Sequence, residues 1–331
     1  MQVFIRCHIL KAVFLKFAAM KRRSNIAAYI AGILFLAVMS VADLFCGGYA
    51  GQEIMLNLRL PRTATALLAG AALALSGAQM QSIFRNPLAD PHIMGVTSGA
   101  ALGAAAATMF SGQTSLTGIS IAASAFIGAL CSAIVILYVS GKFRNASTLL
   151  IFGIMLGFIV NAIVTILQFR TDAESLKMFY SWSAGSFSTT TWQQTGIMAI
   201  ALLLGTVTAI SNRKGLDIIL FGDEFAYMAG ADVRKIRISA LLSCCIMTAA
   251  VTAFCGPLGF VGIVAPHIAR AASGTSSHRI ILPMTLMTGA IISIGADLIS
   301  RISPSPLPIA STMALVGIPI VLYIIIKRPT L

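Results

Sequence analysis

Apolar runs of about 20 residues recur along most of the chain, and they restrict its possible folds more than any other feature. A helix of about 20 apolar residues crosses a hydrocarbon core of roughly 30 Å. Of the 331 residues, 58% are apolar and only 10% are charged, whereas about a quarter are charged in a soluble domain. The sequence therefore predicts an all-α polytopic membrane protein. The runs span 26–46, 64–84, 94–110, 117–140, 148–169, 193–211, 281–299 and 309–326.

A further apolar run, from 238 to 272, is too long for one membrane span. Two prolines and three glycines lie between 256 and 266, and such residues interrupt helices. We interpret the run as two spans that turn near 256, which gives about ten transmembrane helices; a single kinked span is the alternative. The chain then divides into a basic N-terminal segment, 1–24, and a transmembrane domain, 25–331. Translation from Met20 instead of Met1 is the alternative start.

The 23 basic residues sort unevenly between the two sides of the predicted membrane. With ten spans and a cytoplasmic N-terminus, 18 of them fall on the cytoplasmic side and five outside. This is the bias that sets the orientation of membrane proteins, and it predicts cytoplasmic N- and C-termini. The net charge of +13 is scattered over span ends rather than gathered in one patch, so the lipid bilayer, and not nucleic acid, is the expected partner.

The longest polar interval, 216–237, lies on the predicted cytoplasmic side and holds four of the ten carboxylates. Gly222 and Asp223 together indicate a turn and a helix N-cap, and Gly230 indicates the end of that helix. Asp232 can cap a second helix that continues into the next span. The sequence predicts one short helix in this loop.

Phe225 and Met228 are three residues apart and therefore share a face of that short helix. The rest of the loop offers little to cover this apolar stripe. Two interpretations remain open: the helix is a knob that binds a partner protein, or it folds back on its own loops.

Several motifs of known chemistry are absent from the sequence. There is no G-x-x-x-x-G-K-[ST] sequence, so we expect no ATP binding through a P-loop, and neither HExxH nor GxSxG occurs. His267 lacks a second ligand at suitable spacing, and the six cysteines show no CxxC pair. We expect no catalytic residue, no metal site and no cofactor.

Ion-coupled transport is also disfavoured. Carriers of this class place carboxylates within their spans, and the candidates here, Asp43 and Asp297, lie near the predicted outer ends. Asp297 and Arg301 are four residues apart and can pair on one helix face. A pore-forming subunit driven by a separate protein is favoured, and an ion-coupled carrier is the alternative of another class.

Several long motifs resemble one family, the membrane permeases of the binding-protein-dependent ABC importers for iron-siderophores, haem and cobalamin. The resemblance extends from Arg59 to Lys327. The motifs are RLPR at 59–62, RNPLADP at 85–91, GVTSGAALGA at 95–104, WSAGS at 182–186, GDEFAYMAGADV at 222–233 and GPLGFVGIVAPHIAR at 256–270.

This resemblance implies a transport subunit of the bacterial inner membrane that is not itself an enzyme. Its partners would be a dimer of cytoplasmic ABC ATPases, a periplasmic substrate-binding protein and a second permease subunit, identical or paralogous. A ferric siderophore is the favoured cargo, and haem and cobalamin are the alternatives. The sequence does not distinguish among these cargoes.

The resemblance also implies roles for individual residues. Those for coupling to the ATPase are Asp223, Glu224, Phe225, Met228 and Gly230. Those for docking the binding protein through its glutamates are Arg59, Arg62 and Arg301, and the residues of a cytoplasmic gate are Asn86, Leu88 and Ser147. The chain departs from the family pattern at 306–310, where Pro-Leu-Pro-Ile-Ala stands in place of Glu-Leu-Pro-Val-Gly. Any contact of that glutamate is therefore lost.

Overall fold

The structure, a computed structural model, describes residues 25–46, 51–110, 118–143, 145–301 and 307–327. The N-terminal segment 1–24, the choice between Met1 and Met20, and Pro306 lie outside the described residues. The elements are α2 (Asn25–Phe45), α3 (Gln52–Ile54), η1 (Met55–Arg59), α4 (Leu60–Phe84), η2 (Pro91–Met94), α5 (Val96–Phe110), α6 (Gly118–Ser140), α7 (Ala146–Phe169), α8 (Ala173–Ser183), α9 (Trp192–Ile219), α10 (Asp223–Met228), α11 (Val233–Cys255), α12 (Val261–Ser273), α13 (His278–Ser300) and α14 (Ile309–Lys327).

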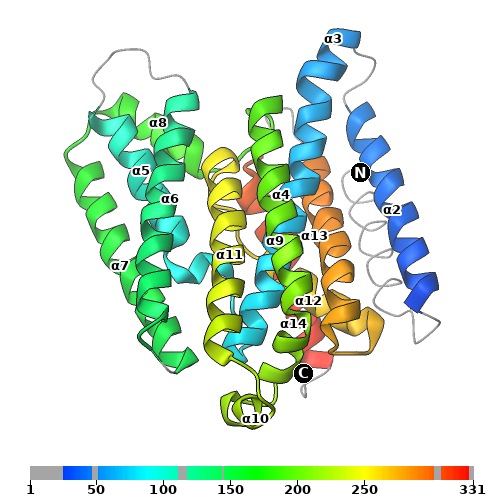
Figure 1. Cartoon of the computed structure of the whole chain (residues 1–331). Coiled ribbons are helices and arrows are strands. Elements are labelled where there is room, and N and C mark those ends of the chain that lie inside the picture. The colour runs from blue at the N-terminus through cyan, green and yellow to red at the C-terminus, as the bar shows by residue number, and fades with distance from the viewer. Residues whose placement is uncertain (1–24, 47–50, 111–117, 144, 302–306, 328–331) are drawn as a thin grey trace.

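The described residues form a helical bundle (Figure 1). Seven helices are long and apolar enough to cross a membrane: α2, the continuous stretch from α3 to α4, α6, α7, α9, α11 and α13. The shorter apolar helices in α5 and α14, together with the 13-residue helix α12, occupy the other three predicted positions. The α10 helix lies at one end of the bundle, and α3 and α8 lie at the other. We refer to these as the α10 end and the α8 end.

The long run at 238–272 forms two helices, as predicted, and the single kinked span is wrong. The α11 helix ends at Cys255, and Gly256 follows with φ +78°, a conformation that glycine adopts without steric cost. The α12 helix has 13 residues, which measure about 20 Å. It is too short to cross the core alone, and the non-helical segment 256–260 precedes it.

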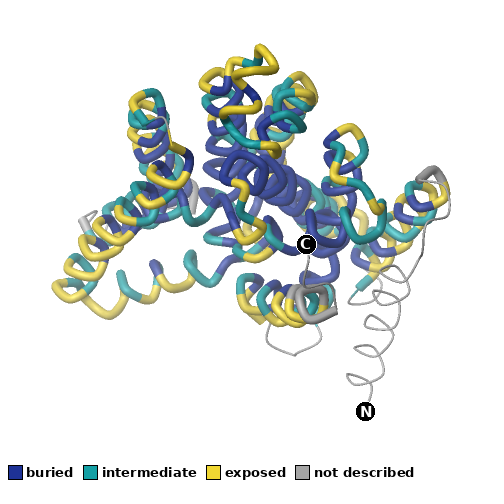
Figure 2. Tube along the Cα trace, turned by 90° about the horizontal axis from the view of Figure 1, so that it is seen from below, coloured by how far each residue is buried: buried dark blue, intermediate teal, exposed yellow. Residues whose placement is uncertain are grey.

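The helices divide into a buried centre and a lipid-facing periphery. In the most apolar window of each, 89% of the residues are buried in α4, 83% in α13 and 72% in α11, against 22–28% in α2, α6, α7 and α9. Figure 2 shows the buried centre surrounded by exposed helix faces. Two large apolar cores result, one around α5, α6 and α7 and one around α4, α12 and α13, and α11 contributes to both. A smaller third core lies between α2, α12 and α13.

Glycines let the central helices touch backbone to backbone. A Cβ on Gly77 of α4 would lie 1.9 Å from the carbonyl oxygen of Gly262 on α12, and one on Gly70 would lie 2.2 Å from that of Gly289 on α13. Gly99 and Gly103 of α5 approach the backbone of α6 in the same way. Small residues at such interfaces are typical of helix association in membranes.

The segment 52–62, which lies between the predicted spans 26–46 and 64–84, is helical. It joins α4 through the π-helical turn η1, in which the Leu60 N–H bonds to the carbonyl of Met55. Pro61 follows directly, and its ring would clash with the carbonyl of Asn57 in a regular α-helix. The wider turn accommodates the proline, so the helix continues beyond the predicted span.

Candidate functional site

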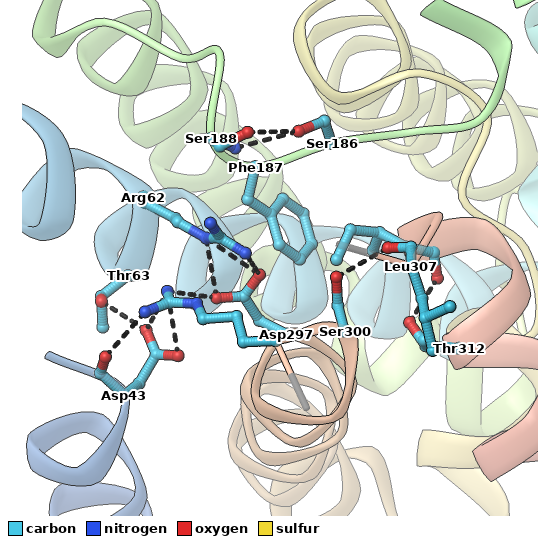
Figure 3. A network of polar contacts seen from close by, with 12 residues as sticks. Asp43, Arg62, Thr63, Ser186, Phe187, Ser188, Asp297, Ser300, Leu307 and Thr312 are labelled. Atoms are coloured by element: carbon cyan, nitrogen blue, oxygen red, sulfur yellow. Dashed lines mark hydrogen bonds and ion pairs between the residues drawn. The ribbon is translucent and has the colours of Figure 1, made fainter. Parts of the chain in front are cut away.

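Four charged side chains form a buried network near the α8 end (Figure 3). Asp43 comes from α2, Arg62 from α4, and Asp297 and Arg301 from α13. Both carboxylates are fully buried, whereas the Arg62 and Arg301 side chains are 17% and 12% exposed. The two positive and two negative charges balance, as buried charges require.

The network joins three helices through short bonds. Arg62 Nη2 donates to Asp297 Oδ1 at 2.7 Å, and its Nε lies 3.0 Å from Oδ2, a two-pronged pair. Arg301 Nη2 lies 2.5 Å from Asp297 Oδ2, and Arg301 Nη1 donates to the Asp43 carbonyl at 3.0 Å. Thr63 donates to Asp43 Oδ2 at 2.5 Å. The network therefore ties α2, α4 and α13 together.

The predicted pairing of Asp297 with Arg301 is confirmed, but the sequence did not indicate the partner of Arg62, which lies 235 positions away. The guanidinium group of Arg62 points towards the Asp297 carboxylate in Figure 3. Arg59 is half-buried and donates to the Leu44 carbonyl at 3.0 Å. The docking role of these three arginines stays a prediction.

The segment that departs from the family pattern lies beside this network. Ser300 Oγ donates to the Leu307 carbonyl at 2.6 Å, and the Leu307 N–H donates to the Ser300 carbonyl at 3.0 Å. The Ala310 N–H donates to the carbonyl of Ala184, at the end of α8. Backbone bonds therefore hold the described residues 307–310 in place.

At the α10 end, α10 begins at Asp223 and ends at Met228, as predicted, but Asp223 is not its N-cap. Gly222, with φ +110°, is the N-cap. The Asp223 carboxylate instead accepts a bond from Arg237 Nη2 at 3.0 Å and lies 4.0 Å from Arg85 Nη2. The Arg237 side chain is only 4% exposed, and this buried cation takes the nearest carboxylate as its counter-charge.

The end of α10 and the start of α11 agree with the predictions from the sequence. Gly230 has φ +77° and follows the C-cap residue of α10. Asp232 Oδ1 accepts the Lys235 N–H at 3.0 Å and so caps α11. That backbone bond, with a further bond from Lys235, lowers the pKa of Asp232 below its ordinary value.

The apolar stripe of α10 is exposed. Phe225 is 47% exposed and Met228 is 80% exposed, whereas Ala226 on the opposite face is buried. Phe221, itself 75% exposed, packs against Phe225 with ring centroids 5.4 Å apart and the ring planes tilted by 50°. The stripe is not folded back on its own loops, and Glu224 and Gly230 are also exposed.

The segment after α4 turns back into the bundle, which the sequence did not predict. Arg85 ends α4 with φ +47°, and Asn86 Oδ1 accepts the Leu88 N–H at 2.9 Å. Leu88 is 49% exposed. Ser147 lies apart in sequence, exposed in the first turn of α7. Among the residues that the structure describes, no hydrogen bond joins Ser147 to the Asn86 turn.

Deeper in the bundle, Asp90 Oδ1 accepts the His92 N–H at 2.9 Å and caps η2. His92 Nε2 donates to the Leu258 carbonyl, and its Nδ1 lies 2.6 Å from Thr97 Oγ1. Asp90 is 3% exposed, a buried carboxylate that we missed when only Asp43 and Asp297 were considered. An aspartate followed by proline at the first helical position was the available indication.

Comparison with known proteins identifies the family of this chain. The model of the FecCD transport family matches residues 15–327 of the chain. The chain belongs to the FecCD transport family. A FecCD chain of this kind is the permease subunit of an ABC transporter, a multi-pass membrane protein that is not itself catalytic.

Individual FecCD relatives cover nearly the whole chain. It is 33% identical to the vitamin B12 import system permease protein BtuC of Klebsiella pneumoniae, over 93% of this chain and 95% of that protein. It is 36% identical to the hemin transport system permease protein HmuU of Yersinia pestis, over 83% and 84%.

The fold of the FecCD chain is also similar to a solved structure. An ABC transporter of the metal-chelate type, in an inward-facing conformation, superposes with a TM-score of 0.83 and 30% identity, covering 90% of this chain and 98% of that one. The all-helical fold predicted from the sequence is therefore confirmed.

Proposed function

We propose that the chain imports an iron chelate, a ferric siderophore in the first instance, across the bacterial inner membrane, with ATP hydrolysed by a separate subunit. Family membership supports an ABC importer over an ion-coupled carrier. The similar solved transporter is of the metal-chelate type, and the hemin and vitamin B12 relatives make haem and cobalamin the alternative cargoes.

The observation that carries this proposal is the exposed stripe of α10 on a rigid base. Its two apolar side chains face away from the protein, while the Asp223–Arg237 ion pair fixes the helix to α11. A preformed apolar face set in polar surroundings suits a hydrophobic cleft in a partner. Asp223, Glu224, Phe225, Met228 and Gly230 would meet the ATPase dimer here.

The distribution of charge supports a cytoplasmic α10 end, and with it cytoplasmic termini. Basic residues concentrate on the cytoplasmic side of membrane proteins. By the helix bounds, the described basic residues at the α10 end are Arg85, Lys142, Arg213, Lys214, Arg234, Lys235, Arg237, Arg270, Arg279 and Lys327, and those at the α8 end are Arg59, Arg62, Arg170, Lys177 and Arg301.

At the α8 end, a periplasmic binding protein would dock on Arg59, Arg62 and Arg301. Arg62 and Arg301 already bond to a buried carboxylate. Glutamates of the binding protein would therefore bind the N–H groups that these bonds leave available. A second permease subunit, identical or paralogous, would complete the path. Asn86, Leu88 and Ser147 would close it on the cytoplasmic side.

A pull-down tests the proposal. The tagged permease is purified in mild detergent from its native host, and the ATPase activity of the co-purifying proteins is measured for wild type and Phe225→Asp. We expect the variant to lose the ATPase, because a carboxylate in an apolar cleft is desolvated without a partner. Phe169→Asp is the matched control, since Phe169 is 92% exposed at the end of α7 that lies away from α10.

The two failures have different meanings. An ATPase that stays bound to Phe225→Asp would remove the coupling role from the α10 stripe. If no ATPase co-purifies even with wild type, the ion-coupled carrier becomes the leading interpretation.

A further inference from the structure

A cavity of about 400 Å³ opens near the α10 end, and Asn86 of the proposed gate is among its lining residues. Its walls come from the end of α4, from α12 and from the start of α13, with Leu220 contributed by the loop after α9. Small-molecule sites in proteins begin at about 300 Å³. The cavity is therefore large enough for a small organic ligand.

Basic side chains dominate the polar lining of this cavity. Arg85, His267, Arg270 and His278 all line it, together with the hydroxyls of Ser82 and Ser276. No carboxylate belongs to the lining. The cavity thus presents two permanent cations and several hydrogen-bond donors to whatever occupies it.

Arg270 is the central cation of the group. Its Nη2 donates to Gln81 Oε1 at 2.6 Å, a neutral partner. Within the described part of the chain, no carboxylate lies within ion-pair distance of Arg270. A half-buried guanidinium has five N–H donors, and a neutral amide does not balance its charge.

Two carboxylates, Asp217 and Asp223, contact residues of the cavity wall, and each has a partner other than Arg270. Asp217 accepts the backbone N–H of His278 at 2.8 Å and lies 2.6 Å from its Nδ1, while Ser82 Oγ lies 2.6 Å from His278 Nε2. Asp223 pairs with Arg237 at 3.0 Å and is 4.0 Å from Arg85. Positive charge in the cavity therefore exceeds the negative charge around it.

We infer that this cavity binds a phosphate-bearing anion, either a free small phosphate compound or the headgroup of an anionic phospholipid. Guanidinium groups match phosphate oxygens in geometry and charge, and the hydroxyl of Ser276 supplies a further donor. Leu220 and Ile281 line the same cavity and accommodate the organic part. Because Arg85 lies between the cavity and Asp223 of α10, an anion in the cavity competes with Asp223 for this arginine.

The test uses the full-length permease in nanodiscs of zwitterionic phosphatidylcholine. The thermal midpoint of unfolding is followed as inorganic phosphate replaces chloride at constant ionic strength. A ligand that binds the folded state alone raises the midpoint. We expect Arg270→Gln to weaken the apparent phosphate affinity about tenfold or more, the usual effect of losing a charge-assisted bond.

Two further variants keep the result interpretable. Arg279→Gln is the matched control, because Arg279 is exposed, lies next to His278 and does not line the cavity. Arg85→Gln serves if Arg270→Gln fails to fold, since the Arg85 side chain is 44% exposed, and a smaller loss of phosphate affinity is expected from it.

Nanodiscs with added phosphatidylglycerol distinguish the two sources of phosphate. A lipid headgroup in the cavity would raise the midpoint without free phosphate, and this rise would be lost in Arg270→Gln but kept in Arg279→Gln. A free anion would leave the midpoint insensitive to phosphatidylglycerol and still responsive to phosphate. The inference is overturned if neither phosphate nor phosphatidylglycerol shifts the midpoint, or if Arg270→Gln and Arg279→Gln respond alike.

Discussion

The two ends of the bundle differ in whether their functional side chains face inward or outward. At the α8 end, four charged side chains turn inward and neutralise one another, with both carboxylates fully buried. At the α10 end, one ion pair anchors a short helix whose apolar side chains turn outward. In the first arrangement the charged groups find their partners within the chain, whereas the second arrangement leaves apolar surface exposed.

This difference separates stability from association. A buried ion network contributes to the folded state because removal of one member leaves the others without a partner. An exposed apolar stripe contributes little to folding and becomes useful only when a second protein covers it. Changes at the α8 end should therefore affect unfolding, and changes on the α10 stripe should affect binding.

The largest effect is expected from Asp297→Asn, which removes the carboxylate that Arg62 and Arg301 share. Breaking a buried ion pair from one side costs about 3–5 kcal/mol. Thermal unfolding in detergent, compared with Glu174→Gln at an exposed site, measures it. Equal midpoints for the two variants would mean that the network does not hold α4 against α13.

A smaller loss is expected from Asp223→Asn, which keeps the shape of the side chain and removes its charge. A hydrogen bond between charged groups contributes about 1.5–3 kcal/mol, and Asp223 is partly exposed, so the lower figure applies. Limited proteolysis of 221–231 together with thermal unfolding measures the release of α10. Unchanged protection of this loop would show that the Asp223–Arg237 pair is not its anchor.

Phe225→Asp should change the free energy of unfolding by no more than about 0.5 kcal/mol, as is usual for exposed positions. This variant is also the one expected to lose the ATPase. A large fall in its unfolding midpoint would contradict the contrast between the two ends, because the stripe would then be part of the folded core.

The smallest effect is expected from Asp232→Asn, at the cap of α11. The folded-state pKa of Asp232 is lowered, chiefly by the Lys235 N–H, so its stabilisation is present at neutral pH and is lost as the pH falls through that pKa. Wild type and variant should therefore differ in unfolding midpoint at pH 7 and converge in acid. A difference that is independent of pH would exclude the carboxylate as its source.

Local features were the ones that the sequence predicted well. The apolar runs give the ten helices, the glycines and prolines near 256 give the break before α12, and Asp232 gives a cap. The Asp297–Arg301 pair was predictable because its members are one helical turn apart. Each of these depends on residues close in sequence.

Long-range features were missed for a physical reason. The pairing of Arg62 with Asp297 joins residues 235 positions apart, and no local pattern indicates which helices become neighbours. The inward turn at Asp90 depends on His92 reaching the Leu258 carbonyl. The helix through 52–62 was not predicted because Pro61 usually interrupts a helix. Here a π-helical turn accommodates the proline, and no composition pattern indicates such a turn.

The glycine contacts of α4 restrict how the bundle can move. Gly70 and Gly77 lie two turns apart and press against carbonyls of α13 and α12. If α4 slid by one residue, alanine methyl groups at 71 and 78 would replace these hydrogens and collide with the same carbonyl oxygens. These contacts oppose sliding and axial rotation of α4, so we expect α4, α12 and α13 to move together in any change of access across the membrane.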